Sequence, residues 1–138
     1  MSVKAGYWTP MLHVADIEKS MEFYGRLGFA TIDTDRCTPL GWARMHCEGG
    51  AVMFLRAEDG HRVDPSVQGV MFYMYTPDLK ELREQLVQAG VKAPEIRYPG
   101  YMPSGEMQLA DPDGYSVAIV HWGKQEHEAW EKRIGAKA

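Results

Sequence analysis

Two stretches decide the fold: HVADIEKSMEFYGRLGF at residues 13–29 and LADPDGYSVAIV at residues 109–120. In the first, Asp16 can cap a helix, because its carboxylate accepts hydrogen bonds from the free amide groups of the first turn. Apolar residues then recur at helical spacing up to Gly28, which can adopt the left-handed conformation that ends a helix. The second stretch indicates two strands joined by Asp113-Gly114, since Asp-Gly is a frequent hairpin dipeptide. Together they predict a mixture of helices and antiparallel strands.

The two halves of the chain repeat one order of elements. Asp78 lies 62 residues after Asp16 (78 − 16), and Gly90 lies the same distance after Gly28. Each half therefore predicts a strand, a helix and three further strands, which makes an α+β fold of two βαβββ modules whose eight strands form a cup. The strands are expected at 7–14, 30–33, 42–47, 51–56, 70–75, 95–97, 106–110 and 115–121, and the helices at 17–27 and 78–89.

Composition indicates one domain over residues 1–138. Module one is expected at about 7–56, a polar connector at 57–68, module two at about 69–122 and a short C-terminal helix at about 124–135. A chain of this length can bury an adequate core without disulfides or a structural metal.

Charge and patterning exclude several classes of function. Fifteen Lys and Arg against nineteen Asp and Glu give a net charge of −4, so no basic face is expected for nucleic acid. No apolar run is long enough to span a membrane, and the N-terminus lacks the apolar core of an export signal. Cys37 and Cys47 form no C-x-x-C motif, which favours a reducing, cytoplasmic location.

The two stretches resemble those of the vicinal oxygen chelate superfamily, which includes glyoxalase I, extradiol dioxygenases and bleomycin-resistance proteins. The resemblance runs from about Trp8 to Trp122. It implies four metal-ligand positions in the metal-using members, which fall here on Thr9, Phe54, Met71 and Ala118. None of these four side chains is an anionic or imidazole ligand, so neither a metal nor another cofactor is expected.

Strand alternation separates an apolar face, which the helices cover, from a face that mixes aromatic and polar side chains. Such a mixture is typical of a small-molecule pocket. Tyr101 lies in a loop at 98–105 that can serve as a lid. No catalytic residue is assigned, and the ligand-binding residues are predicted to be His13, Trp42, Arg44, His46, Phe54, Tyr73, Tyr75, Tyr101, Glu106 and Trp122.

The leading hypothesis is a metal-independent binder similar to bleomycin-resistance proteins. It would sequester an aromatic or cationic organic ligand in the cup, at or near the interface of a homodimer, where Tyr73 and Tyr75 could equally lie. The alternative is a lyase, isomerase or dioxygenase of the same superfamily. That enzyme would hold a metal with His13, His46 and Glu106, or use metal-free acid–base chemistry with His13 and a tyrosine.

Overall fold

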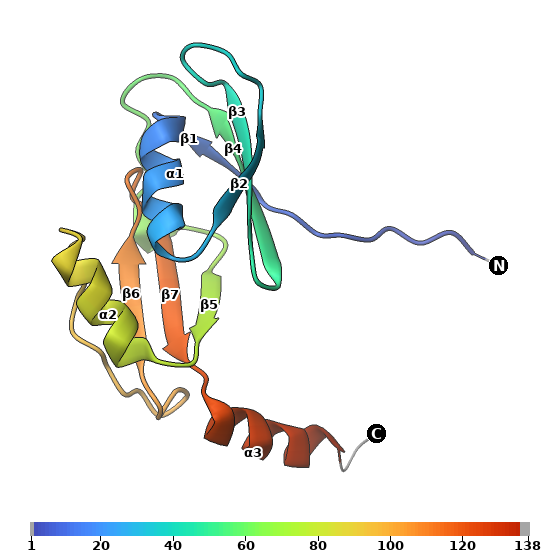
Figure 1. Cartoon of the computed structure of the whole chain (residues 1–138), viewed down its shortest axis with the longest axis vertical. Coiled ribbons are helices and arrows are strands. Elements are labelled where there is room, and N and C mark those ends of the chain that lie inside the picture. The colour runs from blue at the N-terminus through green and yellow to red at the C-terminus, as the bar shows by residue number, and fades with distance from the viewer. Residues whose placement is uncertain (1, 136–138) are drawn as a thin grey trace. The chain divides into compact units, whose positions relative to one another are not determined.

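The computed structural model describes residues 2–135, which divide into two compact units. Unit 1 contains residues up to 63 together with the turn 111–114, and unit 2 contains 64–110 and the chain from 115 onward (Figure 1). Among residues 2–135, no helix is long and apolar enough to cross a membrane.

Unit 1 is a four-stranded sheet with one helix. Strand β1 runs parallel to β4, and β3 lies antiparallel between β4 and β2, which gives the order β1-β4-β3-β2. Helix α1 lies across one face of this sheet (Figure 1). The elements are β1 (Met11–Val14), α1 (Ile17–Arg26), β2 (Ala30–Thr34), β3 (Trp42–Cys47) and β4 (Gly50–Arg56).

Helix α1 begins and ends where the sequence predicts. The Asp16 carboxylate accepts from the Lys19 amide at 3.1 Å, and Gly28 follows the helix at a φ of +107°, where glycine avoids the steric cost of a Cβ. Its buried face packs on the sheet and closes the core of unit 1. That core contains Leu12, Val14, Ile17, Phe23, Tyr24, Ala43, Met45, Val52 and Phe54.

Two buried carboxylates hold the turn 111–114 within unit 1. The Tyr24 hydroxyl donates to Oδ2 of Asp111 at 2.7 Å, and the Ala15 amide donates to Oδ1 of Asp113 at 2.8 Å. Asp111 and Asp113 are only 5% and 2% exposed, so these bonds satisfy groups that would otherwise be costly to bury. Gly114 has a φ of +96°, and a Cβ there would collide with the Val63 carbonyl oxygen.

Unit 2 repeats the order with one strand fewer. Strand β5 runs parallel to β7, and β6 lies antiparallel to β7, in the order β5-β7-β6. Helix α3 has no buried residue and runs away from the end of β7 (Figure 1). The elements are a 3₁₀ turn at Pro65–Val67, β5 (Phe72–Thr76), α2 (Leu79–Gln88), β6 (Glu106–Ala110), β7 (Ser116–His121) and α3 (Lys124–Gly135).

The fold class is confirmed, with seven strands in place of eight. The strand expected at 95–97 is reduced to a single bridge between Arg97 and Glu106. Pro94 and Pro99 flank this segment, and proline has no amide hydrogen for a sheet ladder. Of the expected strand, only Arg97 therefore pairs with β6.

The predicted faces of β4 were wrong. Phe54 was predicted on the ligand-binding face, but it is 0% exposed, whereas its neighbour Leu55 is 37% exposed. A two-residue turn joins β3 and β4, so Ala43 is paired with Phe54 and Met45 with Val52. Directly opposite residues share a face, and odd positions of β3 therefore share the core with even positions of β4.

This register predicts that two neighbouring residues of β4 contribute differently to the free energy of unfolding. We expect Phe54→Ala to lower the free energy of unfolding by about 3–5 kcal/mol, because it removes a buried ring from the core. Leu55→Ala, one residue further along on the outer face, should cost less than about 1.5 kcal/mol. Urea unfolding of the two variants measures both, and equal costs would contradict the register.

Candidate functional site

One face of the three-stranded sheet in unit 2 carries aromatic and polar side chains. Alternation places Tyr73 and Tyr75 of β5 on the same face as Glu106 and Gln108 of β6. On the opposite face, Met107, Leu109, Val117 and Ile119 are buried, and α2 packs on that side with Leu79 and Leu86 buried. We define the tyrosine face by Tyr73, Tyr75, Tyr101, Glu106, Gln108 and Trp122.

The strand register fixes how these residues are spaced. Two rows of paired residues cross the sheet from β5 through β7 to β6. One row is Tyr73, Ala118 and Gln108, and the other is Tyr75, Val120 and Glu106. Adjacent strands are 4.7–4.9 Å apart, so the two outer strands are separated by about 10 Å. Ala118 and Val120 in the centre are both 0% exposed, so the surface that a flat organic molecule would meet is made by the larger side chains of the outer strands.

Glu106 is a buried carboxylate with one unsatisfied oxygen. It is 1% exposed, and its Oε1 accepts from the Tyr101 hydroxyl at 3.0 Å and from Nε2 of Gln108 at 3.3 Å. Its Oε2 is buried without a hydrogen-bond partner among the residues described. Burying a charged oxygen is costly unless a donor or a cation compensates it, so this atom is a strong candidate for a ligand contact.

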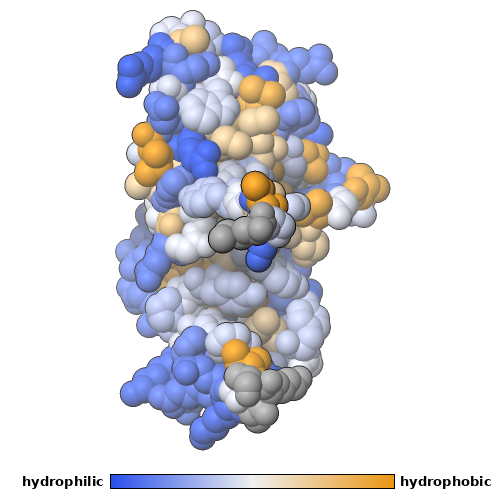
Figure 2. Space-filling view, turned by 90° about the vertical axis from the view of Figure 1, so that its right-hand side faces the viewer, coloured by the Kyte–Doolittle hydropathy of each residue, from blue (hydrophilic) through white to orange (hydrophobic). Residues whose placement is uncertain are grey.

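The aromatic residues of the tyrosine face extend to α3. The rings of Tyr75 and Trp122 lie edge to face with centroids 6.0 Å apart, and the Trp122 indole donates to Nδ1 of His127 at 3.4 Å. Tyr73, Tyr75 and Tyr101 are 47%, 62% and 64% exposed. In the view of Figure 2, pale side chains of intermediate hydropathy gather in the lower half of the molecule. Large rings are thus available for stacking.

The outer face of the four-stranded sheet in unit 1 is a second polar cluster. Nε of Arg44 donates to Nε2 of His46 at 2.9 Å, and its Nη2 donates to the Thr9 hydroxyl at 3.3 Å. The Arg44 guanidinium also lies 5.3 Å from the centroid of the Tyr7 ring. His46 therefore has its Nε2 lone pair engaged. His13 and Trp42 lie on the same face of this sheet, each opposite Leu55.

The predicted site residues thus fall into three groups. Unit 2 brings Tyr73, Tyr75, Tyr101, Glu106 and Trp122 together on one face, and unit 1 presents His13, Trp42, Arg44 and His46 on another. The third group is Phe54 alone, which was predicted to face a ligand but stacks in the core on Tyr24, with ring centroids 5.4 Å apart.

The register makes Met53 of β4, rather than Phe54, the residue equivalent to Ala118 of β7. Ala118 is paired with Tyr73 on β5, and the corresponding partner on β4 is Met53, which is paired with Met11. A thioether is no better a ligand for a hard cation than a phenyl ring. Among residues 2–135, no three His, Cys, Asp or Glu side chains are arranged to hold a metal. The set of His13, His46 and Glu106 stays a prediction, because the two histidines belong to unit 1 and the carboxylate to unit 2.

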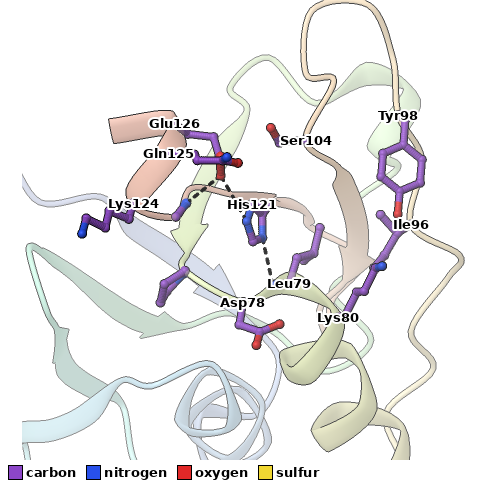
Figure 3. Close-up of a pocket in the computed structure, with 12 residues that line it drawn as sticks. Asp78, Leu79, Lys80, Ile96, Tyr98, Ser104, His121, Lys124, Gln125 and Glu126 are labelled. Carbon is purple, nitrogen blue, oxygen red and sulfur yellow. Dashed lines mark hydrogen bonds and ion pairs between the residues drawn. The ribbon is translucent and has the colours of Figure 1, made fainter. Parts of the chain in front are cut away.

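Sequence reasoning missed a hollow of about 570 Å³ in unit 2, near the starts of α2 and α3 (Figure 3). His121 lies in its wall with both ring nitrogens engaged: Nδ1 accepts from the Leu79 amide at 3.3 Å, and Nε2 contacts Glu126 at 3.1 Å. No nitrogen is left for proton transfer to a ligand. The Glu126 carboxylate accepts a hydrogen bond from the Gly123 amide, just before α3. The three-residue spacing of Gly123 and Glu126 is that of a helix cap, so this contact could have been predicted from the sequence.

The chain belongs to the Glyoxalase/Bleomycin resistance protein/Dioxygenase superfamily, whose family model matches residues 9–119. A search of curated proteins found no match. Similar solved structures include a bleomycin resistance determinant encoded on the transposon Tn5, at 22% identity over 87% of this chain and 99% of that one, with a TM-score of 0.65.

A bleomycin-binding protein complexed with bleomycin is similar at 21% identity, over 86% of this chain and 99% of that one, with a TM-score of 0.65. A possible glyoxalase from Bacillus cereus is similar at 14% identity, over 85% and 99% of the two chains, with a TM-score of 0.62. At these identities the structures establish the shared fold, and the function has to be argued from the site.

The contact between Tyr101 and Glu106 predicts a measurable titration. The hydrogen bond to the Glu106 carboxylate raises the pKa of the Tyr101 phenol above its usual value of 10. The bond should therefore persist through neutral pH and be lost only as the pH rises past that raised value. In ¹³C-tyrosine NMR, Glu106→Gln should return the Tyr101 pKa toward 10, whereas the exposed Glu84→Gln should not change it.

Proposed function

We propose that this protein is a metal-independent small-molecule-binding protein that holds an aromatic or cationic organic ligand on the tyrosine face. The observation that carries the proposal is the buried Glu106, which has one unsatisfied oxygen and lies among exposed tyrosines. A carboxylate in such surroundings orients a polar group of the ligand, while the rings supply apolar contact area.

Family membership supports this proposal. One structure with the same fold is described as a bleomycin-binding protein in complex with bleomycin, so a protein of this fold binds an organic molecule in that case. In this chain, the metal-ligand positions that the resemblance implies carry threonine, phenylalanine, methionine and alanine at 9, 54, 71 and 118, and the neighbouring residue 53 is a methionine. These side chains favour binding over metal-assisted chemistry. Acid–base catalysis by His13 and a tyrosine stays a prediction.

A panel of planar organic compounds tests the proposed function. Aromatic contacts contribute about 0.5–1.5 kcal/mol beyond burial, so Tyr73→Ala should weaken the binding of an active compound several-fold. Tyr98→Ala is the matched control, because Tyr98 is similarly exposed and lines the hollow of Figure 3 instead. Calorimetric titration of the dialysed protein gives the dissociation constants.

Two results would count against the proposed function. Loss of binding in Tyr98→Ala with full binding in Tyr73→Ala would place the ligand in the hollow. Elemental analysis that finds one tightly held metal ion per chain, together with loss of binding when that ion is removed, would contradict metal independence.

We further propose that the chain forms a homodimer in the cytoplasm. Exposed apolar side chains support an interface, among them Trp8 at 93% and Met11 at 45% exposure, and both cysteines are free. We expect sedimentation equilibrium at micromolar concentration to give twice the chain mass, and Trp8→Glu to shift the protein toward the monomer. A monomeric wild type would contradict this proposal.

A further inference from the structure

We propose that the ligand is an organic cation with an N–H group, and that this N–H donates to Oε2 of Glu106. This inference rests on the proposed function and names the chemistry that the tyrosine face selects. It starts from the one polar side chain of that face that is almost wholly buried and still has an unsatisfied atom.

The unsatisfied atom requires a hydrogen-bond donor. Both neighbouring donors, the Tyr101 hydroxyl and the Gln108 amide, contact Oε1 of Glu106. Oε2 accepts from neither. A buried acceptor left unpaired is costly, and more so if it is charged. A ligand that brings a proton to Oε2 recovers that energy, whereas one that brings only contact area does not.

The charge of the site favours a cation over a neutral donor. Arg97 lies opposite Glu106 in the sheet, so it faces the same side, but the ion pairs within 4.0 Å among the described residues do not include one between Arg97 and Glu106. The phenols of Tyr101 and Tyr73 also lie near this carboxylate and are neutral at neutral pH. The Arg97 guanidinium is close enough to Tyr101 to act on its phenol, where it lowers the pKa against the larger raising effect of Glu106. A cationic N–H would supply a directly bonded counter-charge and the missing hydrogen bond together.

The neighbouring rings set the shape of the cation. Tyr75 of β5 and Glu106 of β6 lie on either side of Val120 of β7. The Tyr101 hydroxyl, from the loop at 98–105, donates a hydrogen bond to the Glu106 carboxylate. A flat aromatic cation can direct its N–H at Oε2 while its rings cover the tyrosines, where cation–π attraction adds to stacking. A quaternary ammonium has the charge but no proton to donate.

Three planar probes of similar size separate these contributions. 9-Aminoacridine is cationic at neutral pH and carries N–H groups, 10-methylacridinium is cationic without one, and 9-anthracenemethanol is neutral. For the wild type, we expect 9-aminoacridine to bind about tenfold more tightly than 10-methylacridinium, the ratio typical of one charge-assisted hydrogen bond. This comparison needs no variant, so it does not depend on how any variant folds.

Variants then assign the preference to one atom. Glu106→Gln keeps the shape and an oxygen acceptor but removes the charge, and it should reduce the preference for 9-aminoacridine to about twofold. Glu84→Gln is the matched control, because it removes the same charge from an exposed position of α2 and should leave the preference unchanged. Thermal unfolding of both variants checks that the fold is retained.

The outcomes distinguish this inference from the proposed function. If Tyr73→Ala weakens all three probes but 9-aminoacridine has no advantage, the tyrosine face binds ligands and the N–H inference is overturned. If 9-aminoacridine keeps its advantage in Glu106→Gln, Glu106 is not the acceptor and the inference is again overturned. If Tyr73→Ala and Glu106→Gln change the binding of no probe that binds, the tyrosine face is not the site and the proposed function fails as well.

Discussion

Unit 1 depends on the pair of buried carboxylates in the turn 111–114. Asp113 accepts the amide of Ala15, just before α1, and Asp111 accepts the hydroxyl of Tyr24, in the second half of the same helix. The helix is thereby tied at two points to a turn that comes almost ninety residues later in the chain. Strands β6 and β7 flank this turn directly, so the segment that completes unit 1 also joins the two strands that carry Glu106 and Val120.

Most of the fold could be predicted because it is encoded locally. Asp16 and Asp78 cap their helices as their positions indicate, and Gly28 and Gly90 follow those helices at positive φ. The strand at 95–97 was overestimated because the prediction gave no weight to Pro94 and Pro99. The faces of β4 are also encoded locally, since any two-residue turn between β3 and β4 puts Phe54 on the side of Ala43.

The candidate site was predictable only in part. Alternation correctly placed Tyr73, Tyr75 and Glu106 on one face, because β5 and β6 are short and regular. It could not show that Glu106 is buried, because its burial depends on where the loop places Tyr101. The hollow beside His121 was missed for a similar reason, since three segments distant in sequence form its wall.

The central claim is that the face around Glu106 is where this protein binds its ligand. Amide chemical-shift mapping during a titration with 9-aminoacridine tests it most directly, since every described residue other than proline reports its own surroundings. The account predicts that the largest shifts occur at Tyr73, Tyr75, Tyr101, Glu106, Gln108, Ala118 and Val120. Shifts confined to the hollow at Asp78, His121 and Glu126, or to the outer face of β3 at Arg44 and His46, would contradict it.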